Sequence, residues 1–324
     1  MAEFQVAAAA ANGQGVRAKA PCRFFASGAC RNGNTCPFAH AAAAAPPSPT
    51  STDGATSPRA PSSKPCIFFF QRGECRNGAA CTFSHGAAGA VRAVPAEPDH
   101  LAALAGNYDA AVAVDVECVA TGLTHLDRAV ASVGAVDVRQ QLLLDAVVKP
   151  AAAVISYLEP LTGLNAALVD GRGVALDAAV AQLRAALSPT AVLVGTNISK
   201  DVEWLSLREG VDFAAMIDLA ALFRCWEPAK QRYVYFGQDH VARCWLNAVR
   251  APGQSHDAVG DARISMALLH AYASVRHDPA RLEALRQATL RTPREPSFAM
   301  KHPVFEGVCQ GNRKLCTCGA PHFS

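Results

Sequence analysis

Four carboxylates and one histidine stand in local settings that suit metal-dependent hydrolysis of a phosphodiester. Asp115 and Glu117 lie in the apolar run 111–117, Ala-Val-Ala-Val-Asp-Val-Glu. Side chains alternate along a strand, so the two acids point to one face and the neighbouring valines to the other. Two buried carboxylates repel each other and would take up protons unless a cation lies between them. The pair predicts a cation site on a buried strand, and the valines disfavour the alternative of an ordinary exposed strand.

A third acid follows another predicted strand. The run 191–197, Ala-Val-Leu-Val-Gly-Thr-Asn, predicts a strand and a turn, after which Ile198, Val202 and Leu205 recur at helical spacing. Asp201 falls in the early part of this helix, off its apolar stripe. Taken alone, Asp201 fits an acid that is merely favoured by the helix dipole.

The histidine and the fourth acid flank a predicted helix start. The run 253–257, Gly-Gln-Ser-His-Asp, predicts a polar loop that places His256 before the helix and Asp261 in its first part. A histidine beside a fixed carboxylate suits a general base that takes a proton from water. The alternative is a capping segment with a solvated histidine.

Together these segments resemble the three motifs of the DEDDh exonucleases, and in particular those of the Rex-type and interferon-stimulated RNA exonucleases. The resemblance covers residues 108–275 and includes the runs 150–163 and 216–220. It selects the histidine branch, because the sister branch would have tyrosine at the position of Asp257. The matching motifs are Asp115-Val-Glu117, Gly195-Thr-Asn-Ile-x-x-Asp201-x-x-x-Leu205 and His256-x4-Asp261.

The resemblance implies an α/β, RNase H-like exonuclease fold, a mixed five-stranded sheet flanked by helices on both faces. It also implies two Mg²⁺ or Mn²⁺ ions, in keeping with an all-oxygen ligand set. Asp115 would bridge both ions, Glu117 and Asp261 would hold one, Asp201 would help to hold the other, and His256 would accept the proton. Glu117 would also contact the 3′-terminal sugar, which gives 3′→5′ polarity and nucleoside 5′-monophosphates.

Three positions depart from the family pattern. Thr196 replaces the usual histidine and Gly260 a frequent glutamate. Neither position supplies a metal ligand, so we expect modulated activity and not its loss. Cys118 stands where a bulkier residue is common near the terminal base, which leaves the substrate preference open.

The hydrophobic pattern assigns the elements that must position these residues. We expect strands at 110–119, 128–138, 140–149, 191–196 and 214–219. Helices are expected near 174–187, 198–208, 239–249 and 257–274, with a further C-terminal helix after residue 275. Three cysteines in apolar surroundings, Cys118, Cys225 and Cys244, are expected to be buried.

A repeated pattern of cysteine and histidine precedes this domain. Three thiolates and one imidazole complete a tetrahedral zinc site, which makes these sites structural. The repeats resemble CCCH zinc fingers, a family that binds single-stranded RNA. A disulfide cluster of a secreted protein is the alternative, disfavoured by the absence of a convincing signal peptide. The ligands are Cys22-x7-Cys30-x5-Cys36-x3-His40 and Cys66-x8-Cys75-x5-Cys81-x3-His85.

Aromatic and basic residues are interleaved with these ligands. Bases stack on aromatic rings, and arginine meets phosphate. About half of the phenylalanines are expected to form the small finger cores instead, and the sequence does not sort them. The candidate RNA-binding residues are Phe24, Phe38, Phe68, Phe83, Arg31 and Arg76.

A third cluster, Cys309-x6-Cys316-x-Cys318-x3-His322, lies near the end of the sequence. Its residue types suit a further Zn²⁺, although Cys-x-Cys is a less usual spacing, and the alternative is a loose tail with free thiols. Lys and Arg exceed Asp and Glu by 9 to 5 in residues 1–100 and by 8 to 4 in residues 276–324, while residues 101–275 have 13 against 18. Attraction to a polyanion should therefore come mostly from the flanks.

These features give a domain plan. Residues 1–20 and 42–64 are expected to be disordered, 21–41 and 65–86 to be CCCH fingers, 108–275 the exonuclease domain, and 276–324 a C-terminal helix with the third cluster. No membrane span or secretory signal is expected, so the protein should be intracellular, in nucleus or cytoplasm, with single-stranded RNA as its partner. Two alternatives stay open: an RNA-binding regulator of mRNA with a catalytically silent exonuclease-like scaffold, and a DNA 3′→5′ exonuclease.

Overall fold

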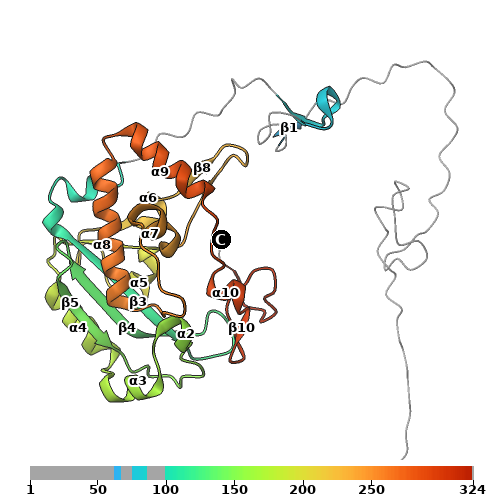
Figure 1. Cartoon of the computed structure of the whole chain (residues 1–324). Helices are drawn as coiled ribbons and strands as arrows, with labels where there is room; N and C mark the ends of the chain where they lie inside the picture. Colours follow the sequence, from blue (N-terminus) through green and yellow to red (C-terminus); the bar gives the residue numbers. More distant parts are fainter. Residues whose placement is uncertain (1–61, 67–74, 86–98, 323–324) are drawn as a thin grey trace, which may run out of the picture. The chain divides into compact units, whose positions relative to one another are not determined.

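The computed structural model describes residues 62–66, 75–85 and 99–322 (Figure 1). Several predictions therefore lie outside the described residues. They are the first finger with Cys22, Cys30, Cys36 and His40, the candidate contacts Phe24, Arg31, Phe38 and Phe68, and the expected disordered segments apart from residues 62–64. Among the helices that are described, none combines the length and the apolar character needed to cross a membrane.

A mixed five-stranded sheet forms the centre of the main domain. Its order is β5-β4-β3-β6-β7, with β3–β4 and β4–β5 antiparallel and β3–β6 and β6–β7 parallel. The predicted sheet is confirmed, and each strand end lies within two residues of its expected position. The strands are β3 (Ala111–Ala120), β4 (Arg128–Asp137), β5 (Leu142–Val147), β6 (Val192–Gly195) and β7 (Ala215–Asp218).

Helices cover both faces of this sheet, and the alternation along β3 decides which core each residue joins. Ala111 and Ala113 pack with α8 (Ala258–Val275) in one core cluster. Val112 and Val114 belong to a second cluster on the opposite face, which includes α4 (Leu176–Ala186). Small alanines on the first face let α8 lie close to the strand that carries Asp115 and Glu117, so the pattern of small and branched residues orients the candidate site.

The remaining helices connect and support these layers. α7 (Gln238–Leu246) and α9 (Pro279–Arg291) pack together and against α8 (Figure 1). All four predicted helices form, and α9 is the expected C-terminal helix. α5 (Ile198–Trp204) ends earlier than predicted, because Ser206 adopts a left-handed backbone conformation with φ of 50° that a helix cannot continue through.

Short elements complete the described chain. The 3₁₀ turns and short helices are η2 (Gly78–Ala80), η3 (Ala102–Leu104), η4 (Tyr108–Ala110), α2 (Glu159–Thr162), α3 (Ala166–Arg172), α6 (Leu219–Leu222) and α10 (Phe298–Lys301). Three two-stranded ribbons are β1 (Ser62–Pro65) with β2 (Phe83–Ser84), β8 (Cys225–Glu227) with β9 (Arg232–Val234), and β10 (Val304–Phe305) with β11 (Val308–Cys309).

The prediction that Cys118, Cys225 and Cys244 are all buried is wrong for two of them. Cys225 is buried, whereas Cys118 and Cys244 are half-buried. Cys118 follows an irregularity in the pairing of β3 with β4, between Glu117 and Cys118. Burial, together with the charges of Asp201 and Glu117, raises the pKa of the Cys118 thiol, so this side chain lies close to the acidic residues and not in a purely apolar core.

Candidate active site

A glycine in β4 allows α8 to reach the acidic strand. Gly134 pairs with Asp115 across the sheet. A Cβ atom at Gly134 would lie 2.3 Å from the carbonyl carbon of Ala258 and 2.4 Å from the backbone nitrogen of Val259, which no real side chain tolerates. The absence of a side chain at this position thus lets the first turn of α8 rest directly on β4.

The start of α8 is fixed by its cap. The Asp257 carboxylate accepts a hydrogen bond of 2.6 Å from the backbone N–H of Gly260. A Cβ at Gly260 would lie 2.5 Å from a carboxylate oxygen of Asp257, so a glutamate there would displace the cap. The glycine that departs from the family pattern is therefore suited to this capped helix start. Asp261, one turn into α8, has 2% exposure.

The structure brings the predicted acids and the histidine together around β3. Ligand atoms of Glu117, His256 and Asp261 lie within 4.8 Å of one another. His256 Nδ1 is 2.7 Å from Asp261 Oδ2, and His256 Nε2 is 3.7 Å from Asp239 Oδ2. Four separate segments thus meet here: β3, the loop before α8, α8 itself, and α7 (Gln238–Leu246), which carries Asp239.

Asp201 joins the group from α5. It is 7% exposed, and burial is the largest cause that raises the pKa of its carboxyl, while a backbone hydrogen bond with Val116 in β3 lowers that pKa. Its charge adds to those that raise the pKa of Asp115. Position 201 was predicted to lie off the apolar stripe of its helix; the side chain is nonetheless buried, because the polar side of α5 near its N-terminus turns toward the acidic strand and not toward solvent.

The electrostatics of the group favour a bound cation. Burial and the nearby charges of Glu117, Asp261 and Asp201 raise the pKa of Asp115 well above its ordinary value. Burial is also the largest cause that raises the pKa of Glu117 to about 8 and that of Asp201 to about 7. Buried like charges are costly unless a cation compensates them. The all-carboxylate oxygens fit Mg²⁺ or Mn²⁺, which are hard cations.

Arg250 belongs to the site although sequence reasoning missed it. Its Nη2 lies 2.5 Å from Asp261 Oδ1 and 3.1 Å from Asp239 Oδ1, and its Nη1 donates to the Ser255 carbonyl at 3.1 Å. The guanidinium and His256 therefore each contact a different oxygen of the Asp261 carboxylate. Arg250 stands in a loop between two helices, where no periodic pattern marks it, so only the folded chain reveals this role.

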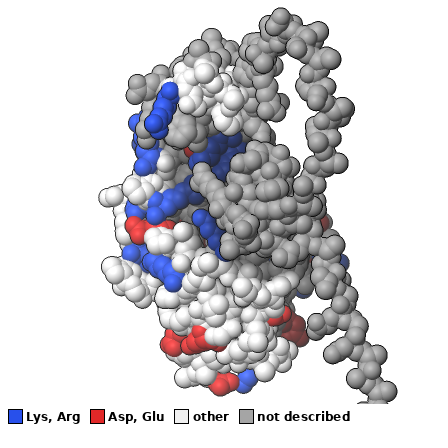
Figure 2. Space-filling view, turned by 90° about the vertical axis from the view of Figure 1, so that its right-hand side faces the viewer, with Lys and Arg blue, Asp and Glu red and all other residues white. Residues whose placement is uncertain are grey.

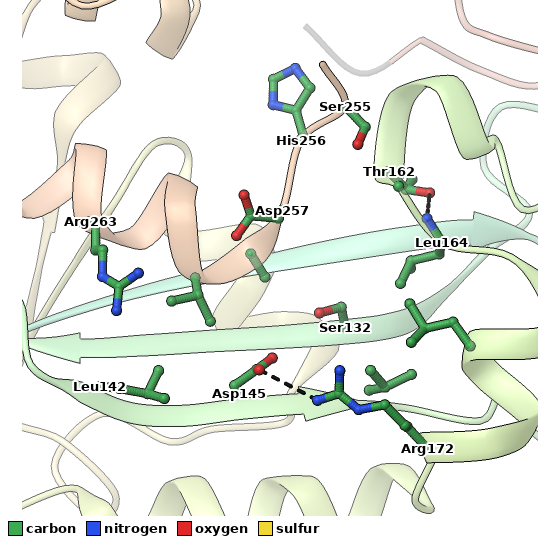
Figure 3. A pocket seen from close by; sticks show the side chains of 15 residues that line it. Ser132, Leu142, Asp145, Thr162, Leu164, Arg172, Ser255, His256, Asp257 and Arg263 are labelled. Atoms are coloured by element: carbon green, nitrogen blue, oxygen red, sulfur yellow. Dashed lines mark hydrogen bonds and ion pairs between the residues drawn. The ribbon is translucent and has the colours of Figure 1, made fainter. Parts of the chain in front are cut away.

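A polar pocket of about 450 Å³ adjoins His256 (Figure 3). Two arginines reach it from different elements, Arg172 from α3 and Arg263 from α8, and Figure 3 shows both directed toward the space between them. Arg172 lies 3.5 Å from Asp145 of β5. The pocket runs from His256 over the surface of β4 and β5, and the Thr162–Leu164 turn after α2 forms part of its wall.

The described part of the second finger gathers its predicted ligands. One ligand atom each from Cys66, Cys75, Cys81 and His85 lies within 4.8 Å of the others. Among the candidate RNA-binding residues of this finger, Phe83 is 47% exposed and Arg76 is exposed. An exposed ring can stack with a base, and the RNA-binding role of Phe83 stays a prediction.

The C-terminal cluster differs from its prediction in one residue. Cys309, Cys316 and Cys318 come together, but the fourth member is His125, from the loop between β3 and β4, and not His322. The ring of His322 instead stacks on that of His125 at a centroid distance of 4.3 Å. Sequence spacing pointed to the nearest histidine, whereas the fold brings a distant one to the sulfurs.

Two segments of the chain match a known protein family. Residues 18–41 and 61–87 match the family described as zinc finger C-x8-C-x5-C-x3-H type (and similar). The chain thus carries two zinc fingers of CCCH type, which implies Zn²⁺.

Two Arabidopsis thaliana proteins are similar to about half of this chain. Small RNA degrading nuclease 3 is 28% identical over 157 residues, which is 48% of this chain and 19% of that protein. Small RNA degrading nuclease 2 is 28% identical over 162 residues, 49% of this chain and 34% of that protein. The matches therefore span only 19% and 34% of the two relatives' lengths.

Solved structures of Pan2 are also similar. The Neurospora crassa Pan2 catalytic unit aligns with a TM-score of 0.45 and 18% identity, over 58% of this chain and 30% of that one. The Saccharomyces cerevisiae Pan2 module in complex with AAGGA RNA aligns with a TM-score of 0.45 and 17% identity, over 55% and 31%.

Proposed function

We propose that this protein is a divalent-metal-dependent 3′→5′ exoribonuclease that acts on single-stranded RNA and is guided to it by CCCH zinc fingers. One observation carries the proposal: Asp115, Glu117, Asp201, His256 and Asp261, which span about 150 positions of the sequence, meet at one buried acidic group. A fold has no structural need to bury four carboxylates together, and their mutual repulsion makes the arrangement costly without a cation. The similarity to RNA-degrading nucleases and the zinc fingers favour RNA as the substrate.

Asp115, Glu117, Asp201 and Asp261 would hold the two ions. When bound, such ions act as Lewis acids toward the phosphate oxygens and make a water molecule easier to deprotonate. In this assignment Asp115 is the shared ligand. Arg250 offsets part of the negative charge of the Asp261 carboxylate, since its guanidinium contacts Oδ1.

His256 would act as the general base. Its hydrogen bond with Asp261 is the largest cause that raises the pKa of His256. That bond engages Nδ1 and fixes the ring, so Nε2 is the nitrogen that can accept a proton from the attacking water. The backbone N–H of His256 also donates to the Leu161 carbonyl of α2 at 2.7 Å, which holds the loop in place.

Arg172 and Arg263 would bind the RNA backbone in the pocket beside His256. Both are exposed and line the pocket that continues from His256. On a different side of the molecule, Figure 2 shows further Lys and Arg side chains in the upper half and Asp and Glu near the lower end. A guanidinium pair suits phosphate, which it can meet through two parallel hydrogen bonds.

The direct test is hydrolysis of a 5′-labelled single-stranded RNA with and without Mn²⁺, beside a DNA of the same sequence. The proposal expects a ladder of products that shorten from the 3′ end only with metal, nucleoside 5′-monophosphates as released products, and faster cleavage of RNA. A labelled RNA blocked by a 3′-phosphate should react more slowly if the 3′ sugar is recognised.

Each failure has its own meaning. Release of a label from the 5′ end would reverse the polarity, and preference for DNA would make the protein a DNA exonuclease. Lack of hydrolysis with every metal would favour the alternative of an RNA-binding regulator whose exonuclease-like domain is catalytically silent. The matched control is Asp170→Asn. Asp170 of α3 is an exposed carboxylate that pairs with Lys149, and it is not among the residues that line the pocket or form the acidic group.

A further inference from the structure

Three cysteines of the C-terminal segment and one histidine of the β3–β4 loop form a second group of metal-ligating type. We propose that His125, Cys309, Cys316 and Cys318 bind a structural zinc ion that fastens residues 298–322 to the end of strand β3. This site is separate from the two fingers and from the acidic group. It does not depend on the proposed nuclease activity.

The distances between the four side chains fit a tetrahedral zinc site. With zinc–sulfur bonds of about 2.3 Å and a zinc–nitrogen bond of about 2.05 Å, a tetrahedron has sulfur–sulfur edges of about 3.8 Å and nitrogen–sulfur edges of about 3.5 Å. The Sγ atoms of Cys309 and Cys316 are 3.5 Å apart, and those of Cys316 and Cys318 are 3.4 Å apart. His125 Nδ1 lies 3.3 Å from Cys318 Sγ and 3.9 Å from each of the other two.

Disulfide bonds do not explain the cluster. A disulfide holds its sulfurs about 2.05 Å apart, far less than the separations seen here, and all three cysteines are free. The ligand types also decide the metal. Three thiolates with one imidazole select zinc over the hard cations that suit the acidic group, and four protein ligands leave no open position for catalysis.

The surroundings orient the ligands as a metal site requires. His125 Nε2 lies 3.2 Å from the Pro321 carbonyl oxygen, so a proton on Nε2 can be donated there, which leaves the Nδ1 lone pair for the metal. The backbone N–H of Gly311 points at Cys309 Sγ at 3.4 Å. Gly311 has φ of 73°, and a Cβ there would come within 3.3 Å of His125 Cβ, so glycine suits this close approach.

The zinc centre would brace the acidic strand from outside. Cys309 donates its backbone N–H to the Leu123 carbonyl at 2.9 Å, and Arg128 donates to the Cys309 carbonyl at 3.0 Å. At the tip of the β10–β11 ribbon, Glu306 accepts a hydrogen bond of 2.5 Å from the buried hydroxyl of Ser156. Ser156 is bridged to Ala120, the last residue of β3, so the C-terminal segment holds both that strand end and the chain that leads into α2.

Zinc content tests the proposal without an activity assay. The full chain should contain three zinc ions per molecule by elemental analysis after dialysis, two in the fingers and one here. His125→Ala should contain two. His322→Ala is the matched control: it removes the stacked ring and should keep three, as should Cys244→Ser, a half-buried thiol outside the cluster.

A rescue variant guards against simple misfolding. His125→Cys places a fourth thiolate at the same position and should restore the third zinc ion, since a four-cysteine site also binds zinc. Trypsin gives a second readout, because Arg313 and Lys314 are exposed within the loop between Cys309 and Cys316. Cleavage there should accelerate at least tenfold in His125→Ala and return to the wild-type rate in His125→Cys.

The opposite results would overturn the site. Two zinc ions in the wild type, three in His125→Ala, or loss of one in His322→Ala would each reject the proposed ligand set. Since every readout is independent of RNA cleavage, an inactive wild type would contradict the proposed function and leave the zinc centre standing.

Discussion

The acidic group and the cysteine–histidine centre are both built from residues far apart in the chain, yet they differ in what holds them. The acids occupy the sheet and the helices packed on it, so each position follows from strand alternation or from a helix turn. The four ligands of the other group come from a loop and from a segment with only short strands. One site is held by the core, and the other must be held by its own metal. Removing a ligand should therefore leave the fold around the acidic group intact, whereas it should loosen the segment that the cysteine–histidine centre holds.

The largest effect on hydrolysis is expected in the acidic group, whose residues the core holds in place. Asp115→Asn would remove the proposed shared ligand together with part of the charge repulsion. Hydrolysis should therefore fall below detection, while zinc content and thermal stability are kept or raised. Nucleotide release, elemental zinc and Tm measured on one preparation check this. Turnover near that of the wild type would sink the assignment of the acidic group.

His256→Ala sharpens the distinction between ligand and base. The rate should fall about 10²–10⁴-fold, as expected for the loss of a general base. Binding of Mn²⁺, measured by calorimetry, should persist because the imidazole is not among the proposed ligands. If Mn²⁺ binding disappeared with the histidine, His256 would be a ligand and its assigned role would be wrong.

The zinc fingers allow a test of whether a metal-dependent module outside the acidic group contributes to RNA binding but not to catalysis. Zinc provides the folding free energy of such small modules, so Cys30→Ser with Cys75→Ser should unfold both. KM for a long single-stranded RNA should rise about tenfold and its salt dependence should flatten, because phosphate contacts are lost. The kcat for a short oligonucleotide should stay unchanged. Equal damage on short and long RNA would mean that the fingers form part of the active site.

The smallest effect concerns pH and the stability of the acidic group. The pKa of Glu117 is raised to about 8 and that of Asp201 to about 7, so between their ordinary values and these pKa values the folded protein holds protons that the unfolded chain has lost. Stability without Mg²⁺ or Mn²⁺ should therefore fall as pH rises from 5.5 to 8. Added Mn²⁺ should remove most of this fall.

The measurement is Tm against pH in buffer without divalent ions and without chelator, so that zinc is retained. Glu117→Gln should flatten the curve relative to the wild type. A metal-free Tm that stays level or rises over this window, with no difference between the two proteins, would contradict the burial of ionised carboxylates.

Sequence patterns predicted the core well because the core obeys local periodicities. The valine alternation along β3 and the apolar spacing of α8 each depend on neighbours in the chain, so their faces could be assigned before the fold was known. Arg250 and Asp239 could not be found this way, since their contacts with Asp261 and His256 arise only when α7 and its following loop pack beside α8. His125 was missed for the same reason, as spacing arguments favour the nearest histidine. The roles of Gly134 and Gly260 can be seen only in the folded chain, because each depends on the atoms that a side chain at that position would clash with.

The separation of His125 from Cys309 has a consequence for how the protein is made. The two ligands are 184 positions apart. At about 5–20 residues per second, a ribosome needs about 10–40 s to synthesise the chain between them. During that interval the loop that bears His125 has no cysteine partners, although the strands and helices around the acidic group are already being completed. The zinc centre can thus close only after that interval, when it would join the first hairpin of the sheet to a segment made well after the sheet's own strands.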